Sequence, residues 1–262
     1  MALSRFASRS NAGRRIDGHG VCLGKTESGK THPNIMPQLM QKLVNGNRET
    51  HRLKDEKGNL IPVSRLLRNG PRAAATFVGR KFFSVRPPVP WISYDARELL
   101  VKLLPREASV LEFGSGLSTL WYSRQFGKVM SVEDHEGWYH EVCRLLDGHK
   151  RANARLYYHQ GAAYCNFAEA AGEKFDLAMI DGSNRDGCMR FALGRMKADA
   201  VVYLDNSDKH PQGGDTRGAE AQLLEAAQAR GGRVVYFTDF APTDLFVNQG
   251  LLAAFGRYVD SV

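Results

Sequence analysis

The stretch VLEFGSGLSTLWYS, residues 110–123, constrains the fold more than any other part of the chain. Its first residues are apolar and partly β-branched, which predicts a buried parallel strand, and Gly114 and Gly116 follow where the chain must turn sharply. Ser118 and Thr119 favour the start of a helix directly after the turn. A strand, a glycine turn and a helix N-terminus form a cradle in which free backbone N–H groups can meet a ligand, so this stretch predicts a nucleotide-type site.

Apolar runs alternate with helical patterns through the rest of residues 91–262, which predicts an α/β domain with a mostly parallel sheet covered on both faces. We expect strands near 110–113, 128–132, 155–159, 175–180 and 200–204. We expect helices near 94–104, 137–146, 164–171, 188–196 and 219–230, and a final hairpin-like pair at 233–237 and 245–248.

Five acids lie at four of the predicted strand ends: Glu112, Glu133, Asp134, Asp181 and Asp205. Ligands of such sheets bind at the carboxyl ends of the strands. Strand ends also collect acids because they are exposed, but five acids at four ends favour a site. Glu133 follows the glycine turn by about 20 residues, where a carboxylate accepts hydrogen bonds from ribose hydroxyls.

These motifs resemble those of class I S-adenosylmethionine-dependent methyltransferases. The likeness covers about 110–250 and rests on VLEFGSGLST, VMSVEDHEGWY, FDLAMIDGS and VVYLDNSD. It implies a doubly wound, Rossmann-like α/β fold whose seven-stranded, mostly parallel sheet has the order 3-2-1-4-5-7-6, with the last strand antiparallel and helices on both faces. It also implies methyl transfer from S-adenosylmethionine, most simply to a hydroxyl oxygen of a small molecule or sugar.

The resemblance also implies which residues hold the cofactor. Glu112, Gly114, Ser115 and Gly116 would hold its methionine end and Glu133 its ribose, while Asp134 and His135 would lie along the adenine. Ala162 departs from the acid that many relatives have beside the adenine amine, and Tyr164 or backbone groups could replace that contact. The full candidate set for cofactor binding is Glu112, Gly114, Ser115, Gly116, Ser118, Thr119, Glu133, Asp134 and Asp181.

Asp181, Asp205 and Asn206 resemble the two carboxylates and one amide that bind a divalent cation in catechol-type O-methyltransferases. Three oxygen ligands suit Mg²⁺ or a similar ion, which would lower the pKa of an acceptor hydroxyl. That family has a lysine three residues after the first ligand, whereas this sequence has Asn184 there, followed by Arg185.

The alternative to a metal is transfer without one, in which Asp205 or His210 takes the hydroxyl proton. The candidate catalytic residues are therefore Asp181, Asp205 and His210.

The first third of the chain is basic. Of 36 Lys and Arg and 28 Asp and Glu in total, residues 1–90 hold 17 and 5, which leaves 19 and 23 for residues 91–262. We expect residues 1–90 to form a partly irregular extension that is either a solvated arm or a surface for nucleic acid, another polyanion or a membrane. An alternative function is therefore a nucleic-acid-directed methyltransferase or a nucleic-acid-binding protein.

The prolines at 87, 88 and 90 predict an extended linker or strap, and we place the domain boundary there. Trp91 and Tyr94 follow it and could line a substrate mouth. Residues 24–31 match the P-loop pattern, but Pro33 interrupts the helix that such a loop needs, so the match is interpreted as coincidence. An NAD-dependent oxidoreductase is disfavoured because Thr119 stands in place of the third glycine of its fingerprint.

Composition excludes further classes. No apolar run approaches the roughly 20 residues that span a bilayer, so we expect no membrane span. The four cysteines lack C-x-x-C spacing, which disfavours a zinc site or a disulfide framework and indicates a reducing, cytoplasmic setting. Residues 1–16 are rich in arginine and serine without an acid, which leaves organellar targeting as the alternative.

Overall fold

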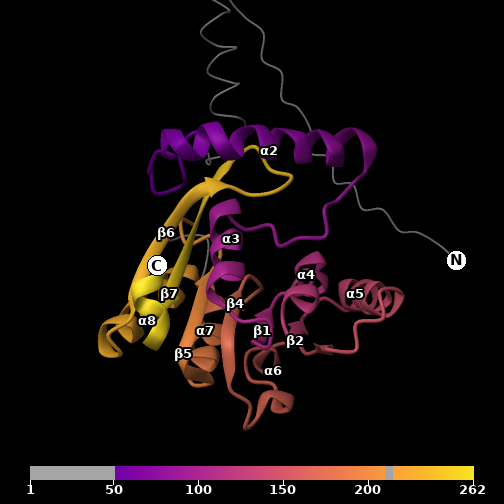
Figure 1. Cartoon of the computed structure of the whole chain (residues 1–262). Coiled ribbons are helices and arrows are strands. Elements are labelled where there is room, and N and C mark those ends of the chain that lie inside the picture. The colour runs from indigo at the N-terminus through magenta and orange to yellow at the C-terminus, as the bar shows by residue number, and fades with distance from the viewer. Residues whose placement is uncertain (1–50, 210–214) are drawn as a thin grey trace, which may run out of the picture.

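A seven-stranded sheet forms the centre of the computed structural model, which describes residues 51–209 and 215–262 (Figure 1). Its strand order is β3-β2-β1-β4-β5-β7-β6, and only β7 runs antiparallel to its neighbours. The order and directions implied by the resemblance are confirmed. The strands are β1 (Ser109–Phe113), β2 (Lys128–Glu133), β3 (Ala154–Tyr158), β4 (Phe175–Ile180), β5 (Met196–Leu204), β6 (Arg233–Phe240) and β7 (Val247–Ala254).

Helices cover both faces of the sheet, as the alternation of strands and helices predicts. Because successive strand side chains point to opposite faces, Leu111 and Phe113 belong to one core cluster and Val110 to the other. The first cluster packs against α6 (Ala162–Cys165), α7 (Arg185–Leu193) and α8 (Thr216–Ala229), and the second against α3 (Tyr94–Leu103), α4 (Leu117–Gln125) and the 3-10 helix η3 (Gly256–Ser261). The helix α5 (Glu136–Gly148) packs beside α4.

The register of the central strands brings the predicted site residues to one edge. Phe113 pairs with Val132 and Ile180, and Ile180 pairs with Leu204. The next residues along the chain are the glycine turn after Phe113, Glu133 and Asp134 after Val132, Asp181 after Ile180, and Asp205 after Leu204. The parallel register therefore places the polar strand ends next to one another.

Two predicted helices differ from the structure. The helix expected at 164–171 is only α6 and a short 3-10 turn, η1 (Ala168–Ala170), because Phe167 between them turns inward and stacks on Phe191. The helix expected at 188–196 lies earlier, since Met196 already pairs with Phe175 as the start of β5.

A long helix that the sequence did not predict, α2 (Val63–Phe83), lies across the β6 end of the sheet (Figure 1). Its buried Asn69 donates to Asp239 and Asp95, both at 2.9 Å, and Ala73 packs with Phe240 and Tyr94. Tyr94 is therefore a core residue, 3% exposed, and lines no substrate mouth. That residues 1–90 form an extension separate from the domain at 91–262 stays a prediction.

Some expectations concern residues outside the described part of the chain. These are the targeting segment 1–16, the P-loop match at 24–31 and His210. Among the described helices, none combines the length and apolar character needed to cross a bilayer.

Candidate functional site: two joined cavities at the strand ends

The glycine turn after β1 is built by close contact between two loops. Gly114 has a φ of 92°, and a Cβ atom there would lie 2.8 Å from the Cα of Gly182, which follows β4. Only glycine fits this position. Gly116 differs, because a Cβ atom there would meet nothing closer than the Ser118 hydroxyl at 3.6 Å. The turn is therefore held by Gly114, whereas a Cβ atom at Gly116 would make only ordinary contacts with the protein.

Glu112 lies beneath this turn and supports it. Its carboxyl group accepts hydrogen bonds from the hydroxyls of Ser118 (2.5 Å), Thr119 (2.6 Å) and Ser131 (2.8 Å). Burial raises the pKa of Glu112 to about 7, while the three hydroxyl donors oppose that rise. Thr119 also accepts the Gly116 N–H at 2.9 Å. Glu112 and Thr119 thus hold the start of α4, and their direct contact with a cofactor stays a prediction.

A cavity of about 530 Å³ opens in front of the turn. Of the expected cofactor residues, the lining contains Gly114, Ser115, Gly116, Ser118, Glu133, Asp134 and Asp181. Its other wall comes from residues that the sequence did not single out for the cofactor, and includes Arg80, Arg86, Val89, Trp91 and Trp138. Arg86 and Val89 belong to the proline-rich segment, which here runs as a strap over the cavity.

Both carboxylate oxygens of Glu133 are occupied. Oε2 accepts the backbone N–H and the hydroxyl of Ser115, at 3.0 and 2.8 Å, and Oε1 accepts the N–H groups of Asp134 and His135, at 3.2 and 3.0 Å. Only the Ser115 hydroxyl can rotate away. A ribose hydroxyl would therefore reach Glu133 by replacing that hydroxyl.

Trp138 is the main residue that sequence reasoning missed in this cavity. Its indole Nε1 donates to the Ser115 carbonyl at 2.7 Å, which fixes the ring beside Gly116, and its side chain is 36% exposed. A fixed and partly open indole face suits stacking on a purine. His135, expected along the adenine, instead accepts the Trp138 N–H at 3.1 Å and caps α5. Tyr164, offered as a substitute contact, is 2% exposed and belongs to the core.

We expect Glu133→Gln to weaken S-adenosylmethionine binding by about 10- to 100-fold. The neutral amide loses charged acceptors for ribose hydroxyls and places an NH₂ group against backbone N–H donors. Calorimetric titration measures the effect, and Glu136→Gln, a nearby exposed carboxylate that lines neither cavity, is the control. Equal affinities in Glu133→Gln and the unmodified protein would contradict this role.

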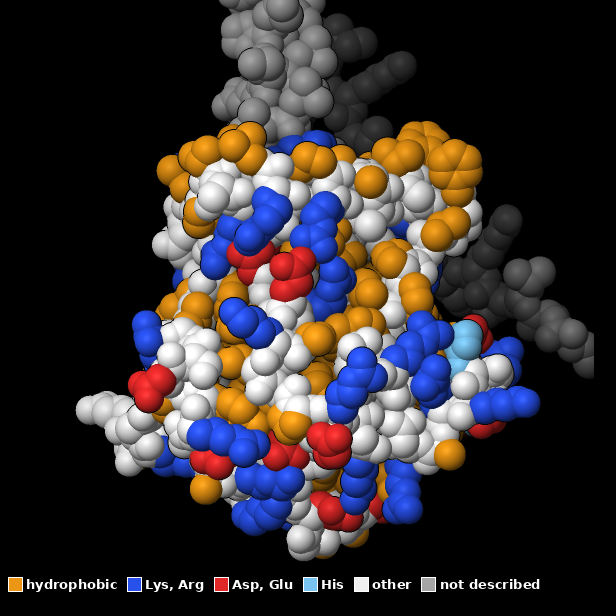
Figure 2. Space-filling model, viewed as in Figure 1, with side chains coloured by type: hydrophobic (Ala, Val, Ile, Leu, Met, Phe, Trp, Pro, Cys, Tyr) orange, Lys and Arg blue, Asp and Glu red, His pale blue; other side chains and the backbone are white. Residues whose placement is uncertain are grey.

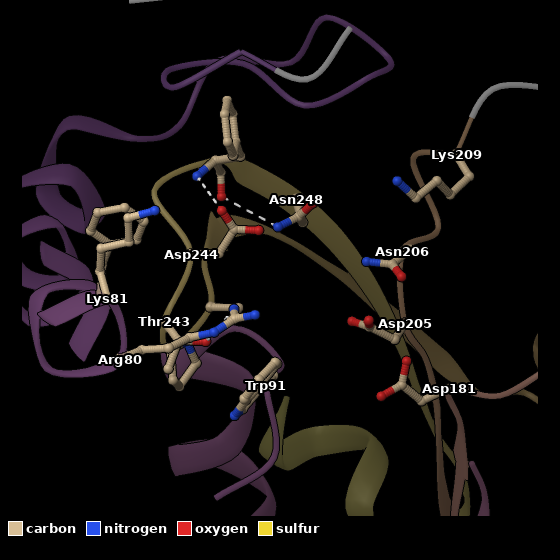
Figure 3. A pocket seen from close by; sticks show the side chains of 14 residues that line it. Arg80, Lys81, Trp91, Asp181, Asp205, Asn206, Lys209, Thr243, Asp244 and Asn248 are labelled. Carbon is tan, nitrogen blue, oxygen red and sulfur yellow. Dashed lines mark hydrogen bonds between the residues drawn. The ribbon is translucent and has the colours of Figure 1, made fainter. Parts of the chain in front are cut away.

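A second cavity, of about 650 Å³, lies beside the first and shares Arg80, Trp91 and Asp181 with it. Figure 3 shows Asp181, Asp205 and Asn206 along one wall and Arg80 and Trp91 facing them. Arg80 lies over the Trp91 ring, 4.9 Å from its centroid. The remaining wall comes from α2 and from the loop between β6 and β7, through Phe77, Lys81, Thr243, Asp244 and Phe246.

Asp181 and Asp205 act as one unit at the floor of this cavity. Asp205 is 7% exposed, and loss of water together with the neighbouring Asp181 carboxylate raises the pKa of Asp205 well above its ordinary value. Their mutual hydrogen bond raises the pKa of Asp205 further and lowers that of Asp181. Burial also raises the pKa of Asp181, but Arg185 opposes that rise. Asp181 is therefore the more readily ionised member of the pair.

Arg185 contacts Asp181 of this pair and also Asn206, the residue that follows Asp205. Its Nη2 lies 3.5 Å from Oδ1 of Asp181 and donates to Oδ1 of Asn206 at 3.2 Å. Asn184 determines this placement, since its left-handed backbone (φ 44°) and its side chain, which accepts the Gly187 N–H at 3.2 Å, start α7 at Arg185. The guanidinium group thus lies within the set of oxygens expected to bind a metal.

Comparison by sequence finds no matching family model and no matching curated protein. Solved structures do match. Cofactor-bound Rv0187 from MTB superimposes with a TM-score of 0.52 at 20% identity, covering 71% of this chain and 97% of that one. The O-methyltransferase from Bacillus cereus in complex with SAH gives a TM-score of 0.51 at 16% identity, covering 85% and 97%. The chain has the class I methyltransferase fold.

Within this methyltransferase fold, the divalent cation expected at the strand ends stays a prediction, and Arg185 competes with it for the same oxygens. The Asn206 oxygen that would bind the ion accepts a hydrogen bond from Arg185, and the guanidinium charge repels a second cation at this distance. In the described part of the chain, no cluster of three His, Cys, Asp or Glu side chains could hold a metal, and the expected set of Asp181, Asp205 and Asn206 contains only two side chains of these types.

Proposed function

We propose that the protein is an S-adenosylmethionine-dependent methyltransferase that methylates a hydroxyl oxygen of a small molecule or sugar without a metal ion. The observation that carries the proposal is the junction of the two cavities. A cavity at the glycine turn, with Glu133 and Trp138 on its walls, meets a second cavity at Asp181. This arrangement suits a donor on one side and an acceptor on the other.

The residues of the first cavity fit S-adenosylmethionine. Gly116 lines the cavity without a side chain, so a ligand can approach its backbone, the Glu133 carboxylate is placed for the ribose, and the Trp138 ring offers a face to the adenine. When bound, S-adenosylmethionine would supply an electrophilic methyl group.

Asp181 is the proposed base. It is the more readily ionised member of the Asp181–Asp205 pair, its side chain is 38% exposed, and it lines both cavities. An acceptor hydroxyl would donate a hydrogen bond to this carboxylate and leave its proton there as the oxygen is methylated. Arg185 opposes the rise in the pKa of Asp181, while Trp91 and Arg80 lie on the opposite side of the cavity.

The lining of the second cavity supports a sugar or a similar polar acceptor. Aromatic rings of Phe77, Trp91 and Phe246 can pack on C–H faces, and Asn248 and Asp244 offer polar atoms between them. Nucleic acid remains the alternative acceptor, since the basic residues 1–90 favour a polyanion.

Calorimetric titration of the purified protein with S-adenosylmethionine and with NAD tests the class. We expect saturable binding of the first and none of the second, because Thr119 replaces the third glycine of the NAD fingerprint. Binding of NAD alone would overturn the proposal. Transfer from methyl-labelled S-adenosylmethionine to a panel of sugars, phenols and RNA then identifies the acceptor, and RNA as the sole product would favour the alternative.

A further inference from the structure

Large hydrophobic side chains gather on the outer face of α2. Of the eleven that are exposed in the described part of the chain, seven lie between residues 60 and 85, and their exposed fractions range from 44% to 72%. Figure 2 shows hydrophobic side chains along this edge of the molecule. We name this set the α2 outer face; it comprises Leu60, Val63, Leu67, Val78, Phe82, Phe83 and Val85.

The spacing of these residues makes the face continuous. Val63, Leu67, Val78 and Phe82 are separated by four, eleven and four residues, which returns each side chain to one side of a helix. The opposite side of α2, with Asn69 and Ala73, is buried against the sheet. The exposed stripe is therefore not needed to hold α2 on the domain.

The same segment is strongly basic. Residues 51–90 contain nine Lys and Arg and two Asp and Glu, and α2 itself contains five cations and no acid. Arg65 and Arg68 pair with Asp95, and Arg72 pairs with Glu98. Lys57 pairs with Glu220. Among the described residues, the other cations of this segment form no ion pair: Arg52, Lys54, Arg80, Lys81 and Arg86.

We propose that the α2 outer face binds the surface of a membrane that contains anionic lipid. An apolar stripe next to cations such as Lys81 and Arg86 is the pattern of a helix that lies in the interface, with its apolar side chains among the acyl chains and its cations at the headgroups. With five cations in 21 residues, α2 is suited to lie on a bilayer and not to cross it. Nucleic acid would use the cations but gives no partner to the aliphatic side chains of Val63, Leu67 and Val78.

The location of α2 connects this surface to the second cavity. Phe77, Arg80 and Lys81 line that cavity from the same helix that carries the α2 outer face. Bound to a membrane, the protein would hold the cavity mouth close to the headgroups. If the proposed function holds, the acceptor is then a hydroxylated headgroup or a lipid-linked sugar; membrane binding itself does not depend on the proposed function.

Sedimentation of the full-length protein with lipid vesicles tests the proposal. We expect binding to vesicles with about 30% phosphatidylglycerol, at least about tenfold weaker binding to pure phosphatidylcholine, and weakening by salt. Leu67→Glu/Phe82→Glu should reduce binding at least about tenfold. The control is Val101→Glu/Leu224→Glu, which places the same charges at exposed apolar positions of α3 and α8 and should bind as the unmodified protein does.

Vesicle binding needs no cofactor, so its failure is separate from failure of the proposed function. Val63→Ser/Val78→Ser provides a milder second test if the glutamate variant does not fold, and it should also weaken binding. The proposal is overturned if the full-length protein ignores anionic vesicles or if both stripe variants bind them normally. Two further results would assign the face to another partner and so overturn the proposal. One is a dimer that the stripe variants dissociate, and the other is RNA binding that the stripe variants lose while no form of the protein binds vesicles.

Discussion

Gly116→Val should abolish S-adenosylmethionine binding while leaving the protein folded. The position has an extended φ of 171°, and an added Cβ atom would make only ordinary contacts of 3.6 Å or more with the protein. The valine side chain would instead fill the space in front of the turn. We expect calorimetry to show a loss of more than about 100-fold in affinity, with an unchanged melting temperature.

Gly114→Ala is the matched comparison, two residues earlier in the same turn. Its methyl group would lie 2.8 Å from the Gly182 backbone, and its φ of 92° is unfavourable for any side chain. We therefore expect a loss of about 2–4 kcal/mol in the free energy of unfolding. If Gly116→Val bound the cofactor normally, the cavity at the turn would not be the cofactor site.

Arg185→Ala should remove most of the activity and move its pH dependence. Arg185 lowers the pKa of Asp181 against the effect of burial, so its loss leaves Asp181 protonated to higher pH. We expect turnover at neutral pH to fall about 100-fold and the rising limb of the pH–rate profile to move to higher pH. Arg185→Lys keeps the charge and should retain more activity at neutral pH.

The free energy of unfolding tests the role of Arg185 without an acceptor substrate. The raised pKa values of Asp181 and Asp205 mean that folding stability is lost as pH rises through them, and Arg185 limits that loss. Because Asp181 is partly exposed, we expect Arg185→Ala to cost only about 1–2 kcal/mol, more at pH 8 than at pH 4. Turnover that stops with chelator, or Mn²⁺ binding by the free protein, would contradict the metal-free proposal.

The sheet and the strand-end acids could be predicted because their signals are local. A glycine turn after a short apolar strand and an acid after the next strand occur within a few residues of each other, and parallel pairing then aligns all the strand ends. The sequence alone therefore identifies Gly114 and Glu133 as candidates.

The missed features depend on long-range packing. Gly70 and Pro71 are typical of the end of a helix, yet α2 continues through them. It forms because Asn69 and Ala73 pack against β6, which lies about 170 residues later in the sequence, and against α3, which is closer in the sequence. Trp138 lies in the helix predicted at 137–146, and only its hydrogen bond to the Ser115 carbonyl turns the ring toward the cavity. Arg185 was visible in the sequence, but its direction depends on the left-handed backbone of Asn184.

The walls shared by the two cavities have a kinetic consequence. Arg80, Trp91 and Asp181 border both spaces, so whatever occupies the first cavity forms part of the boundary of the second. If the proposed function holds, binding of donor or acceptor in one cavity should therefore change the affinity of the other cavity for its ligand. The spent donor, S-adenosylhomocysteine, should compete with S-adenosylmethionine and form a dead-end ternary complex of protein, spent donor and acceptor. This complex should appear as inhibition of turnover by high concentrations of acceptor once S-adenosylhomocysteine accumulates.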